Sequence, residues 1–264
     1  MVETDQNYLK RVILASDVYM ICLQHALTTE KEEIMGLLLG EVDEKERISH
    51  ISGAMILLRS DKQPDRVEIS PELIYTATTY AEEISQRINK PIRVLGWYHS
   101  HPHITVWPSH VDVRTQSTYQ MLDSLFVGLI FSVYHNDAGS SANHVQVTCF
   151  QAIKSGIDYE RREIELVVGI SPFEFHNLEG IVKLPKILFE EEINRHAEVG
   201  SGSRDELTLI HNNAIKTVEL LHIVSQIAKP LCTDLEKRLL ITKSRIKKLQ
   251  RLKKKLQDKN LKVV

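Results

Sequence analysis

The sequence lacks any apolar run long enough to cross a bilayer, for which about 20 consecutive apolar residues are needed. Cysteine is also scarce: Cys22, Cys149 and Cys232 are odd in number and far apart. Such a set does not make a disulfide framework and is typical of buried thiols in a reducing compartment. The N-terminus is polar and acidic, unlike a secretory signal peptide. We therefore expect a cytoplasmic and nuclear protein that is neither exported nor inserted in a membrane.

A strong charge imbalance is absent as well, because the formal net charge is -2. Hydrophobic residues make up 42% and charged residues 26% of the chain, values that exclude a disordered or fibrous protein. A length of 264 residues allows one sizeable domain and an appendage. Basic residues outnumber acidic ones over residues 237–259, so the C-terminal end is locally cationic.

Helical and strand patterns alternate along the first two thirds of the chain. An amphipathic helix is predicted over residues 16–27 with Ser16 as a candidate N-cap, and helices are also predicted over 71–89, after Ser70, and from Ser109 onward. Short apolar or alternating runs predict strands over residues 34–40, 48–58, 92–98, 126–134, 145–152 and 163–168, the first two as a hairpin. The fold class is therefore α/β, with a mixed sheet flanked by helices.

The C-terminal part follows a different pattern. Residues 169–199 match no clear template, and the Gly-Ser-Gly-Ser run at 200–203 predicts a joint, which gives a catalytic domain over residues 1–199 and a helical region over 204–264. A helical stripe begins at Leu207 and is expected to break at Pro230, where a second helix restarts.

Leucines and their neighbours in that second helix recur at steps of four and three from Leu235 to Leu256, which is the seam of a coiled coil. The seam could simply pack on its own domain. The basic run beside it could be a solvated face, a contact for an acidic partner or a nucleic-acid patch. A partner helix is favoured, because a coiled-coil seam beside a domain with its own core has little else to pack against.

The segment from Gly96 to Asp112 carries the strongest chemical signal. In an extended strand His99 and His101 point to the same face, because side chains alternate with a period of two. Asp112, beyond a turn, can supply a third ligand. Two imidazoles and a carboxylate leave one position open for water, which is how catalytic zinc sites differ from structural ones. Zn²⁺, one per chain with water as fourth ligand, is the expected cofactor.

Each of these residues also has a plainer interpretation. A histidine pair on a strand is more often structural than metal-binding, and Ser109 with Asp112 fits a capping box at a helix start. The same ligand set also makes the iron site of non-haem oxygenases. A hydrolase needs a proton shuttle, for which Glu30, Glu32 and Glu33 are nearly interchangeable, apart from the position of Glu33 immediately before a strand.

Two histidines and two tryptophans near the candidate ligands are not among the predicted site residues. His103 and His110 lie close to the ligands in sequence, and we expect them to surround the site or face the substrate rather than bind metal. Trp97 and Trp107 could line a substrate groove, but burial in the core is at least as consistent with their chemistry.

The pattern His99-Ser-His101-Pro, six residues, Ser109, two residues and Asp112, with Glu33 before Ile-Met-Gly-Leu-Leu-Leu-Gly, resembles the JAMM motif of the MPN-plus metalloproteases. The resemblance implies an MPN domain with a curved mixed sheet, and a C-terminal helical hairpin or coiled coil. It makes Glu33 the general acid and base and Ser109 a group that stabilises the oxyanion. The three ligand positions and the glutamate are all present, whereas a catalytically silent MPN scaffold would be expected to lack one of these four.

Flanking segments resemble the lysine-63-specific deubiquitinases of this family, which act in BRISC and Abraxas-containing complexes; the quoted residues are Arg59-Ser-Asp-Lys, Asp65-Arg-Val-Glu-Ile-Ser70 and 96–116. The resemblance implies hydrolysis of lysine-63-linked ubiquitin chains. It also implies assembly, through the C-terminal helices, with an MPN-like pseudoenzyme scaffold of the Abraxas type in a higher-order complex. Neither a membrane nor nucleic acid is an expected partner.

Overall fold

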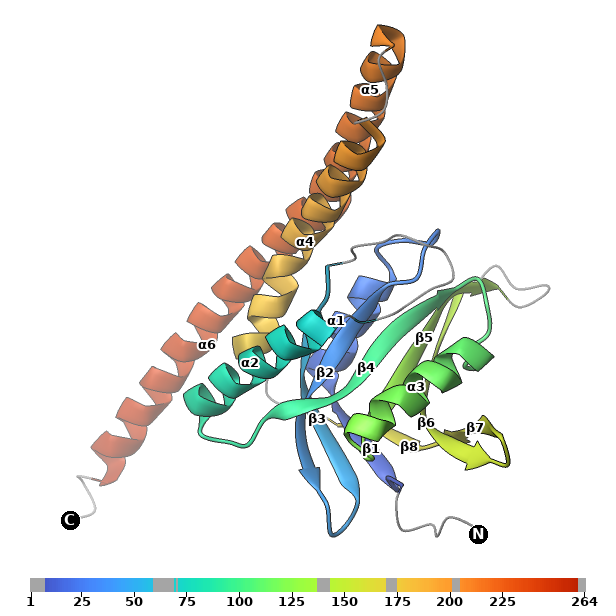
Figure 1. Cartoon of the computed structure of the whole chain (residues 1–264). Coiled ribbons are helices and arrows are strands. Elements are labelled where there is room, and N and C mark those ends of the chain that lie inside the picture. The colour runs from blue at the N-terminus through green and yellow to red at the C-terminus, as the bar shows by residue number, and fades with distance from the viewer. Residues whose placement is uncertain are drawn as a thin grey trace. The chain divides into compact units, whose positions relative to one another are not determined.

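A computed structural model describes residues 8–58, 69, 71–136, 143–169, 175–200 and 205–260 (Figure 1). Residues 59–68, 70 and 201–204, which carry several of the predicted features, lie outside the described part. The chain divides into two compact units, Met1–Ile187 and Leu188–Val264. The domain limits expected from the sequence, 1–199 and 204–264, stay a prediction. Among the described residues, no helix combines the length and the apolar character that a membrane span requires.

The first unit is built on a mixed eight-stranded sheet with the order β7-β6-β5-β4-β2-β3-β1-β8. Three neighbouring pairs are parallel and four are antiparallel. The strands are β1 (Arg11–Ala15), β2 (Met35–Asp43), β3 (Ile48–Ile56), β4 (Arg93–Pro102), β5 (Val127–Asn136), β6 (Asn143–Ser155), β7 (Asp158–Glu163) and β8 (Glu165–Gly169). The expected α/β fold with a mixed sheet is confirmed.

The sheet is curved, and segments from opposite halves of its strand order meet. Leu9, just before β1, donates its backbone N–H to Gln151 Oε1 of β6 at 2.9 Å, although four strands lie between β1 and β6 in the sheet order. The same glutamine donates to the carbonyl of Phe126 at 3.0 Å. Because a buried polar group is stable only when it is hydrogen-bonded, Gln151 joins three segments of the first unit.

Helices cover both faces of the sheet (Figure 1). On one face lies α1 (Ser16–Ala26), whose His25 Nδ1 is 2.9 Å from Tyr98 Oη of β4. On the other face, α3 (His110–Leu122) is joined to β4 because Trp97 Nε1 donates to Gln116 Oε1 at 2.8 Å, and α2 (Pro71–Ile88) contributes Ala77 to the same core. Adjacent residues of β4 therefore serve opposite cores, as strand alternation requires.

Strands β2 and β4 approach closely where the ring of Tyr98 crosses β2. Gly36 of β2 pairs with Tyr98 of β4, and a Cβ at this position would lie 2.3 Å from the Tyr98 ring. Only glycine leaves room for that ring to cross the neighbouring strand. The first glycine of the Ile-Met-Gly-Leu-Leu-Leu-Gly run is therefore required by the packing of Tyr98.

Several elements differ from the sequence-based prediction. β1 and β7 were not predicted, and residues 163–168 are divided between β7 and β8. The N-cap of α1 is Ala15 rather than Ser16, which is the first helical residue, and no side chain caps the helix. Residues 169–199, which matched no template, contain most of α4 (Phe175–Gly200), with Pro185 inside the helix. Asn177 at its beginning donates to Asp17 Oδ2 and to the carbonyl of Ser52, at 2.7 and 2.8 Å.

The second unit consists of helices. The end of α4 lies beside α5 (Glu206–His222), where Glu219 accepts from Arg195 and is 2.7 Å from His196 Nε2. Beyond α5 the chain continues through a π-helical segment, η2 (Ile223–Ala228), into α6 (Lys229–Asn260). The expected helical C-terminal region is confirmed.

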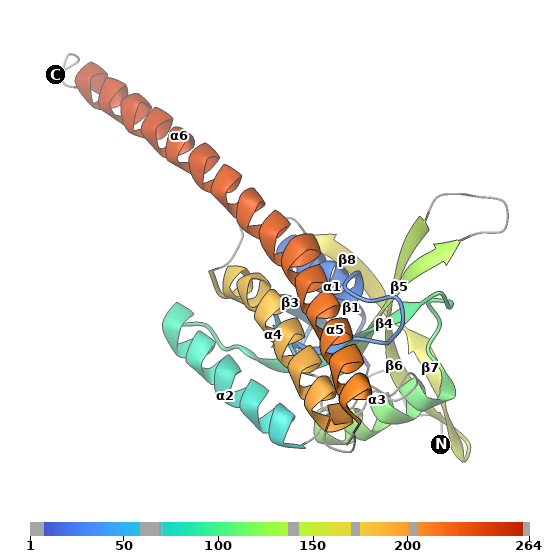
Figure 2. The same cartoon turned by 90° about the horizontal axis from the view of Figure 1, so that it is seen from above.

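The predicted break at Pro230 is wrong, because α5, η2 and α6 form one continuous helix (Figure 2). Proline has no N–H and its ring clashes with the carbonyl four residues earlier in an α-helix. The wider π turn accommodates this: Lys229 N–H donates to the carbonyl of Val224, five residues before it. Proline changes the hydrogen-bond spacing here without ending the helix.

Candidate metal centre

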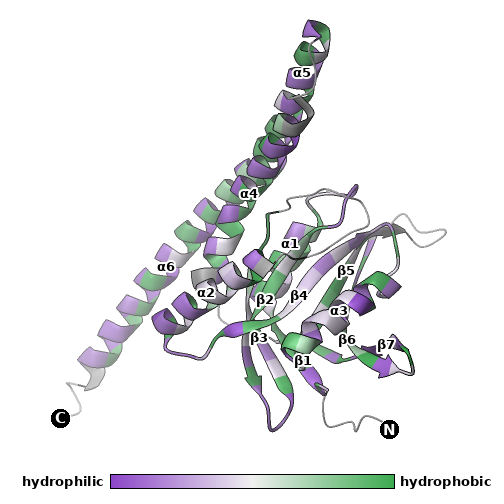
Figure 3. Ribbon diagram, in the orientation of Figure 1, coloured by the Kyte–Doolittle hydropathy of each residue, from purple (hydrophilic) through white to green (hydrophobic). Residues whose placement is uncertain are grey.

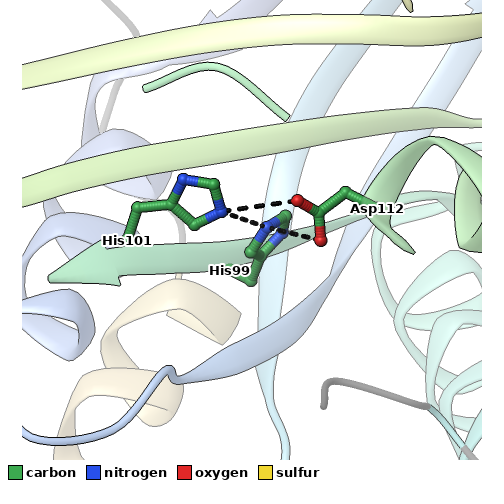
Figure 4. Close-up of side chains that lie close together, drawn as sticks. All are labelled: His99, His101 and Asp112. Carbon is green, nitrogen blue, oxygen red and sulfur yellow. Dashed lines mark hydrogen bonds and ion pairs between the residues drawn. The ribbon is translucent and has the colours of Figure 1, made fainter. Parts of the chain in front are cut away.

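The end of β4 and the start of α3 bring His99, His101 and Asp112 together (Figure 4). All three side chains are buried, with at most 7% of any residue exposed. The two histidines share one face of β4, as alternation predicts. Asp112 lies in the first turn of α3, where Ser109 N and Oγ both donate to its Oδ2 at 2.7 Å and its own N–H returns to Ser109 Oγ at 3.2 Å. The predicted capping box is therefore present.

The distances among the three side chains fit a tetrahedral ion. His99 Nε2 lies 3.1 Å from His101 Nε2 and 3.3 Å from Asp112 Oδ1, and His101 Nε2 lies 3.5 Å from Asp112 Oδ2. Two ligand atoms about 2.0–2.1 Å from a tetrahedral zinc are separated by about 3.3 Å. The donor set and its spacing therefore suit zinc.

Neighbouring groups orient both imidazoles. His101 Nδ1 lies 2.7 Å from the carbonyl of Thr105, so in the neutral ring Nδ1–H donates there and Nε2 keeps its lone pair for a metal. The His99 ring stacks on Trp97 at 4.5 Å between centroids and 15° between planes. Trp97 is fully buried and hydrogen-bonded to Gln116, so it supports the site from the core and does not line a groove.

The electrostatics of the cluster favour a positive charge between the three groups. Burial acts to raise the pKa of Asp112, but the neighbouring His101 and His99 outweigh it and hold that pKa well below its usual range. Burial likewise acts to lower the pKa of His101, but Asp112, the Thr105 carbonyl and Glu33 together raise it. An ionised carboxylate facing two imidazoles is the charge arrangement that a divalent cation would stabilise.

Of the three candidate glutamates, the structure brings Glu33 to the cluster. Glu33 Oε1 lies 3.9 Å from His101 Nε2, and the Glu33 side chain is 15% exposed. The next residue is fixed to β4, because Ile34 N donates to Ser100 Oγ at 3.0 Å and Ser100 N donates to the Ile34 carbonyl at 3.1 Å. Glu30 instead lies 3.6 Å from the exposed His103. Glu33 therefore differs from Glu30 because it directly precedes Ile34, which is hydrogen-bonded to β4.

The other residues singled out in the sequence lie around the cluster. His103 and His110 are exposed and are not part of the group of three possible ligands. Trp107 is 45% exposed, with the Arg161 guanidinium 4.1 Å from its ring centroid. The sequence did not single out Ser100 or Thr105, which act through backbone contacts. Period-two alternation from His99 back to Trp97 could have revealed the stacked ring.

A second group of possible ligands, Glu192, His196 and Glu219, lies between α4 and α5 in the helical unit. Arg195 hydrogen-bonds both carboxylates, to Glu192 Oε2 at 2.6 Å and to Glu219. A guanidinium already neutralises these acids, so the group is an ion-pair network that joins two helices.

Comparison with known proteins agrees with the two-part architecture. Residues 7–124 match the family described as JAB1/Mov34/MPN/PAD-1 ubiquitin protease, and residues 177–256 match the BRCC36 C-terminal helical domain. The chain is 45% identical over 252 residues to a protein of Xenopus tropicalis named Lys-63-specific deubiquitinase BRCC36, with 93% of this chain and 95% of that protein covered. The protein of the same name from Camponotus floridanus is 47% identical over 254 residues, covering 96% and 98%. The chain therefore belongs to the BRCC36 family of JAB1/Mov34/MPN/PAD-1 proteins.

Proposed function

We propose that this chain is a zinc-dependent deubiquitinase that hydrolyses isopeptide bonds in ubiquitin chains, preferentially those linked through lysine 63. The observation that carries the proposal is the convergence of two imidazoles and a carboxylate, with Glu33 beside them, in a member of this family. The named activity of the relatives, matched along more than nine tenths of the chain, supports both the reaction and the linkage.

In this proposal His99, His101 and Asp112 hold one zinc ion, with water in the fourth position. Bound zinc lowers the pKa of such a water to about 7 and polarises a carbonyl oxygen. Glu33 takes the proton of the attacking water on a carboxylate oxygen and passes it to the leaving lysine amine. Its partly exposed carboxylate suits this transfer, because it lies 3.9 Å from His101 Nε2 at the edge of the cluster.

In this proposal the Ser109 hydroxyl both orients Asp112 and stabilises the oxyanion, and it cannot do both at the same time. Its hydroxyl donates to Asp112 Oδ2 at 2.7 Å and so orients a ligand. To stabilise the tetrahedral oxyanion, the same hydroxyl has to rotate toward the substrate. The capping bond from Ser109 N–H to Asp112 remains when it does, so the ligand stays in place.

A different reaction deserves a direct test, because two histidines and a carboxylate also bind iron in non-haem oxygenases. Glu33 and Ser109 favour hydrolysis, since an oxygenase has no use for a group that shuttles a proton to a leaving amine. Metal analysis of the purified chain should give zinc near one equivalent. Stoichiometric iron together with iron-dependent oxygen consumption would contradict the proposal.

The decisive experiment for the reaction is a panel of di-ubiquitins of different linkage, incubated with the purified chain alone and with an MPN-like partner. We expect cleavage of the lysine-63-linked substrate to be fastest. Equal rates on lysine-48-linked and lysine-63-linked di-ubiquitin would refute the linkage preference. No cleavage of any linkage, by a zinc-loaded chain with its partner, would refute the isopeptidase itself.

The second part of the proposal is assembly with a catalytically inactive MPN-like scaffold of the Abraxas type through the helices after residue 203. Apolar side chains along α6 are exposed, including Leu239, Ile246, Leu249 and Leu256 at the predicted seam positions. Figure 3 shows green apolar residues mixed with purple polar ones along this helix. Several exposed leucines on one helix indicate a protein partner, since burying each is worth about 1.5–3 kcal/mol.

Charge placed on the seam tests this assembly. Ile246→Asp combined with Leu249→Asp should weaken binding of the scaffold by at least about tenfold, because two apolar contacts are replaced by buried charges. Lys247→Asp is a matched control, since it changes the net charge by the same two units away from the seam. Calorimetry on purified proteins gives both affinities. If the control weakens binding as much as the seam variant, charge and not the seam governs assembly.

A further inference from the structure

Two strained residues meet beside the metal centre. Among the described residues, only four other than glycine have positive φ: Arg47, Asn89, His103 and Tyr134. Arg47 lies in the β2–β3 turn and Asn89 directly after α2, where such backbone is common. His103 (φ 61°) and Tyr134 (φ 56°) have their rings 5.8 Å apart, with a 32° tilt between planes. A left-handed bulky residue persists only where surrounding contacts hold it, and such residues gather at functional sites.

The strain at Tyr134 comes with a break in the strand. The pairing of β5 with β6 shifts register between Ser132 and His135, so Tyr134 lies in a bulge. Bulges redirect side chains beside active sites. Here the redirected side chain donates from Oη to the carbonyl of Leu27 at 2.6 Å, across 107 positions of sequence.

The carbonyl that accepts this bond belongs to the residue that ends α1. Leu27 is the C-cap, and the carbonyls at a helix C-terminus have no partner within the helix. From this point the chain runs to Glu33 and then to Ile34, which is fixed to Ser100 of β4 by two hydrogen bonds. The Tyr134 bond therefore holds the first end of the segment whose other end carries Glu33.

Further hydrogen bonds hold the loop after β4 close to Tyr134 and segment 27–33. His103 N donates to the Val133 carbonyl at 2.9 Å, and Ser132 Oγ donates to the Ile104 carbonyl at 2.6 Å, so the loop after β4 is held against β5. His103 Nε2 then lies 3.6 Å from Glu30, in the middle of the segment 27–33. Both side chains of that ion pair are more than half exposed, so the pair is weak, and the Tyr134 hydroxyl provides the firmer attachment.

We propose that Tyr134 is a positioning residue, whose hydroxyl holds segment 27–33 so that the Glu33 carboxylate faces the two histidines. The proposal rests on the proposed function for the role of Glu33 and deepens it. Glu33 Oε1 lies 3.9 Å from His101 Nε2, and segment 27–33 is the backbone that brings it there. An error of 1 Å in such a group can cost about 10²-fold in rate, and loosening one end of the segment broadens the positions it adopts.

A double-mutant cycle on the full chain with its partner tests this. Tyr134→Phe keeps the ring and removes only the hydroxyl, and we expect kcat on lysine-63-linked di-ubiquitin to fall about threefold to tenfold, the effect of one hydrogen bond. KM and bound zinc should not change. In the Glu33→Gln background the same substitution should change kcat less than about twofold, because there is no carboxylate left to position. Tyr75→Phe, at an exposed tyrosine of α2, is the matched control.

Hydrogen exchange of the amides of residues 28–33 provides a readout that does not depend on activity. Tyr134→Phe should speed this exchange while Tyr75→Phe leaves it unchanged. Unchanged exchange and unchanged kcat, an equal loss of kcat in both Glu33 backgrounds, or loss of zinc would each overturn the positioning role. If the wild-type assembly cleaves no ubiquitin chain but exchange still responds, the attachment stands and the proposed reaction fails.

Discussion

The two units of this chain treat their apolar side chains in opposite ways. In Met1–Ile187, leucines of the central strand β2, such as Leu37 and Leu38, are fully buried, and His99, His101 and Asp112 are buried as well. In Leu188–Val264, Leu240 and Leu249 of α6 are 67% and 63% exposed. The first unit buries its apolar side chains in its own core. The second is a set of helices whose apolar surface is available for another protein.

We propose that the first unit carries out the reaction and that the second unit regulates it. The groups that we propose for the reaction come from the sheet and the two connections beside it, where hydrogen bonds to backbone and side chains hold them. Within the helical unit, the polar network of Arg195, His196 and Glu219 is partly exposed and joins two helices. We infer that damage to the first unit abolishes the reaction, whereas damage to the second changes how the reaction is controlled.

The largest effect is expected from removing a metal ligand. His101→Ala should release zinc and abolish cleavage, because two remaining ligands do not hold the ion in a catalytic geometry. His110→Ala, an exposed histidine nearby, should retain both. Zinc per chain by mass spectrometry and di-ubiquitin cleavage measure the result. Stoichiometric zinc in His101→Ala would remove this residue from the ligand set.

The next largest effect is expected at the proton shuttle. Glu33→Gln should keep the fold and the zinc but lower kcat by about 10² to 10⁴, the usual range for a general acid and base. Glu30→Gln provides the control, because that carboxylate is exposed and lies against His103. Near-normal turnover by Glu33→Gln, or an equal loss with Glu30→Gln, would mean that another group moves the proton.

Most of the candidate site could be predicted from sequence because the side chains that form it are close together in the chain. His99 and His101 are two positions apart on one strand, and Ser109 and Asp112 share a capping box, so local rules place them. The attachment of Tyr134 to Leu27 could not be predicted, since it depends on a bulge and on strands that meet only in the folded sheet. Glu33 is an intermediate case, because it precedes Ile34, whose hydrogen bonds to Ser100 of β4 form only in the folded sheet.

The fold shows the same division. Strands with strong apolar patterns, such as β2 and β5, were predicted, whereas β1 is only five residues long and β7 is almost entirely charged. Short or charged strands form because neighbours supply hydrogen bonds, and a single-sequence pattern does not contain those neighbours. Pro230 led to a wrong break because the rule against proline in helices holds for α-helical spacing, and the chain uses a π turn instead.

A matched pair of leucine substitutions tests the comparison directly. Leu38→Ala in β2 should lower the free energy of unfolding by about 2–5 kcal/mol, because it leaves a cavity in a full core. Leu249→Ala in the free chain should cost less than about 0.5 kcal/mol, because the side chain is exposed and alanine favours helix. Urea unfolding followed by tryptophan fluorescence and circular dichroism gives both values. A large cost at Leu249 without a partner would show that α6 packs within its own chain.

The smallest effect is expected in the ion-pair network of the helical unit. Burial acts to raise the pKa of Glu219, but Arg195 and His196 outweigh it and lower that pKa below the ordinary value of 4.5. A carboxylate whose pKa is depressed by folding stabilises the folded state above its unfolded pKa and loses that contribution as the pH falls through the folded value. About a third of the side chain is exposed, so solvent screening limits the contribution to about 1 kcal/mol or less.

Glu219→Gln should therefore speed hydrogen exchange of the α5 amides at neutral pH by about fivefold at most, because about 1 kcal/mol corresponds to about a fivefold change in an equilibrium constant. The ratio to wild type should approach one as the pH falls below 4.5 toward the lowered pKa, and it should also shrink in 1 M salt, where the Debye length is about 3 Å. Glu236→Gln, at an exposed site on α6, is the control. A ratio that persists in acid would mean that Glu219 acts through packing, and the two units would then differ less than their exposure indicates.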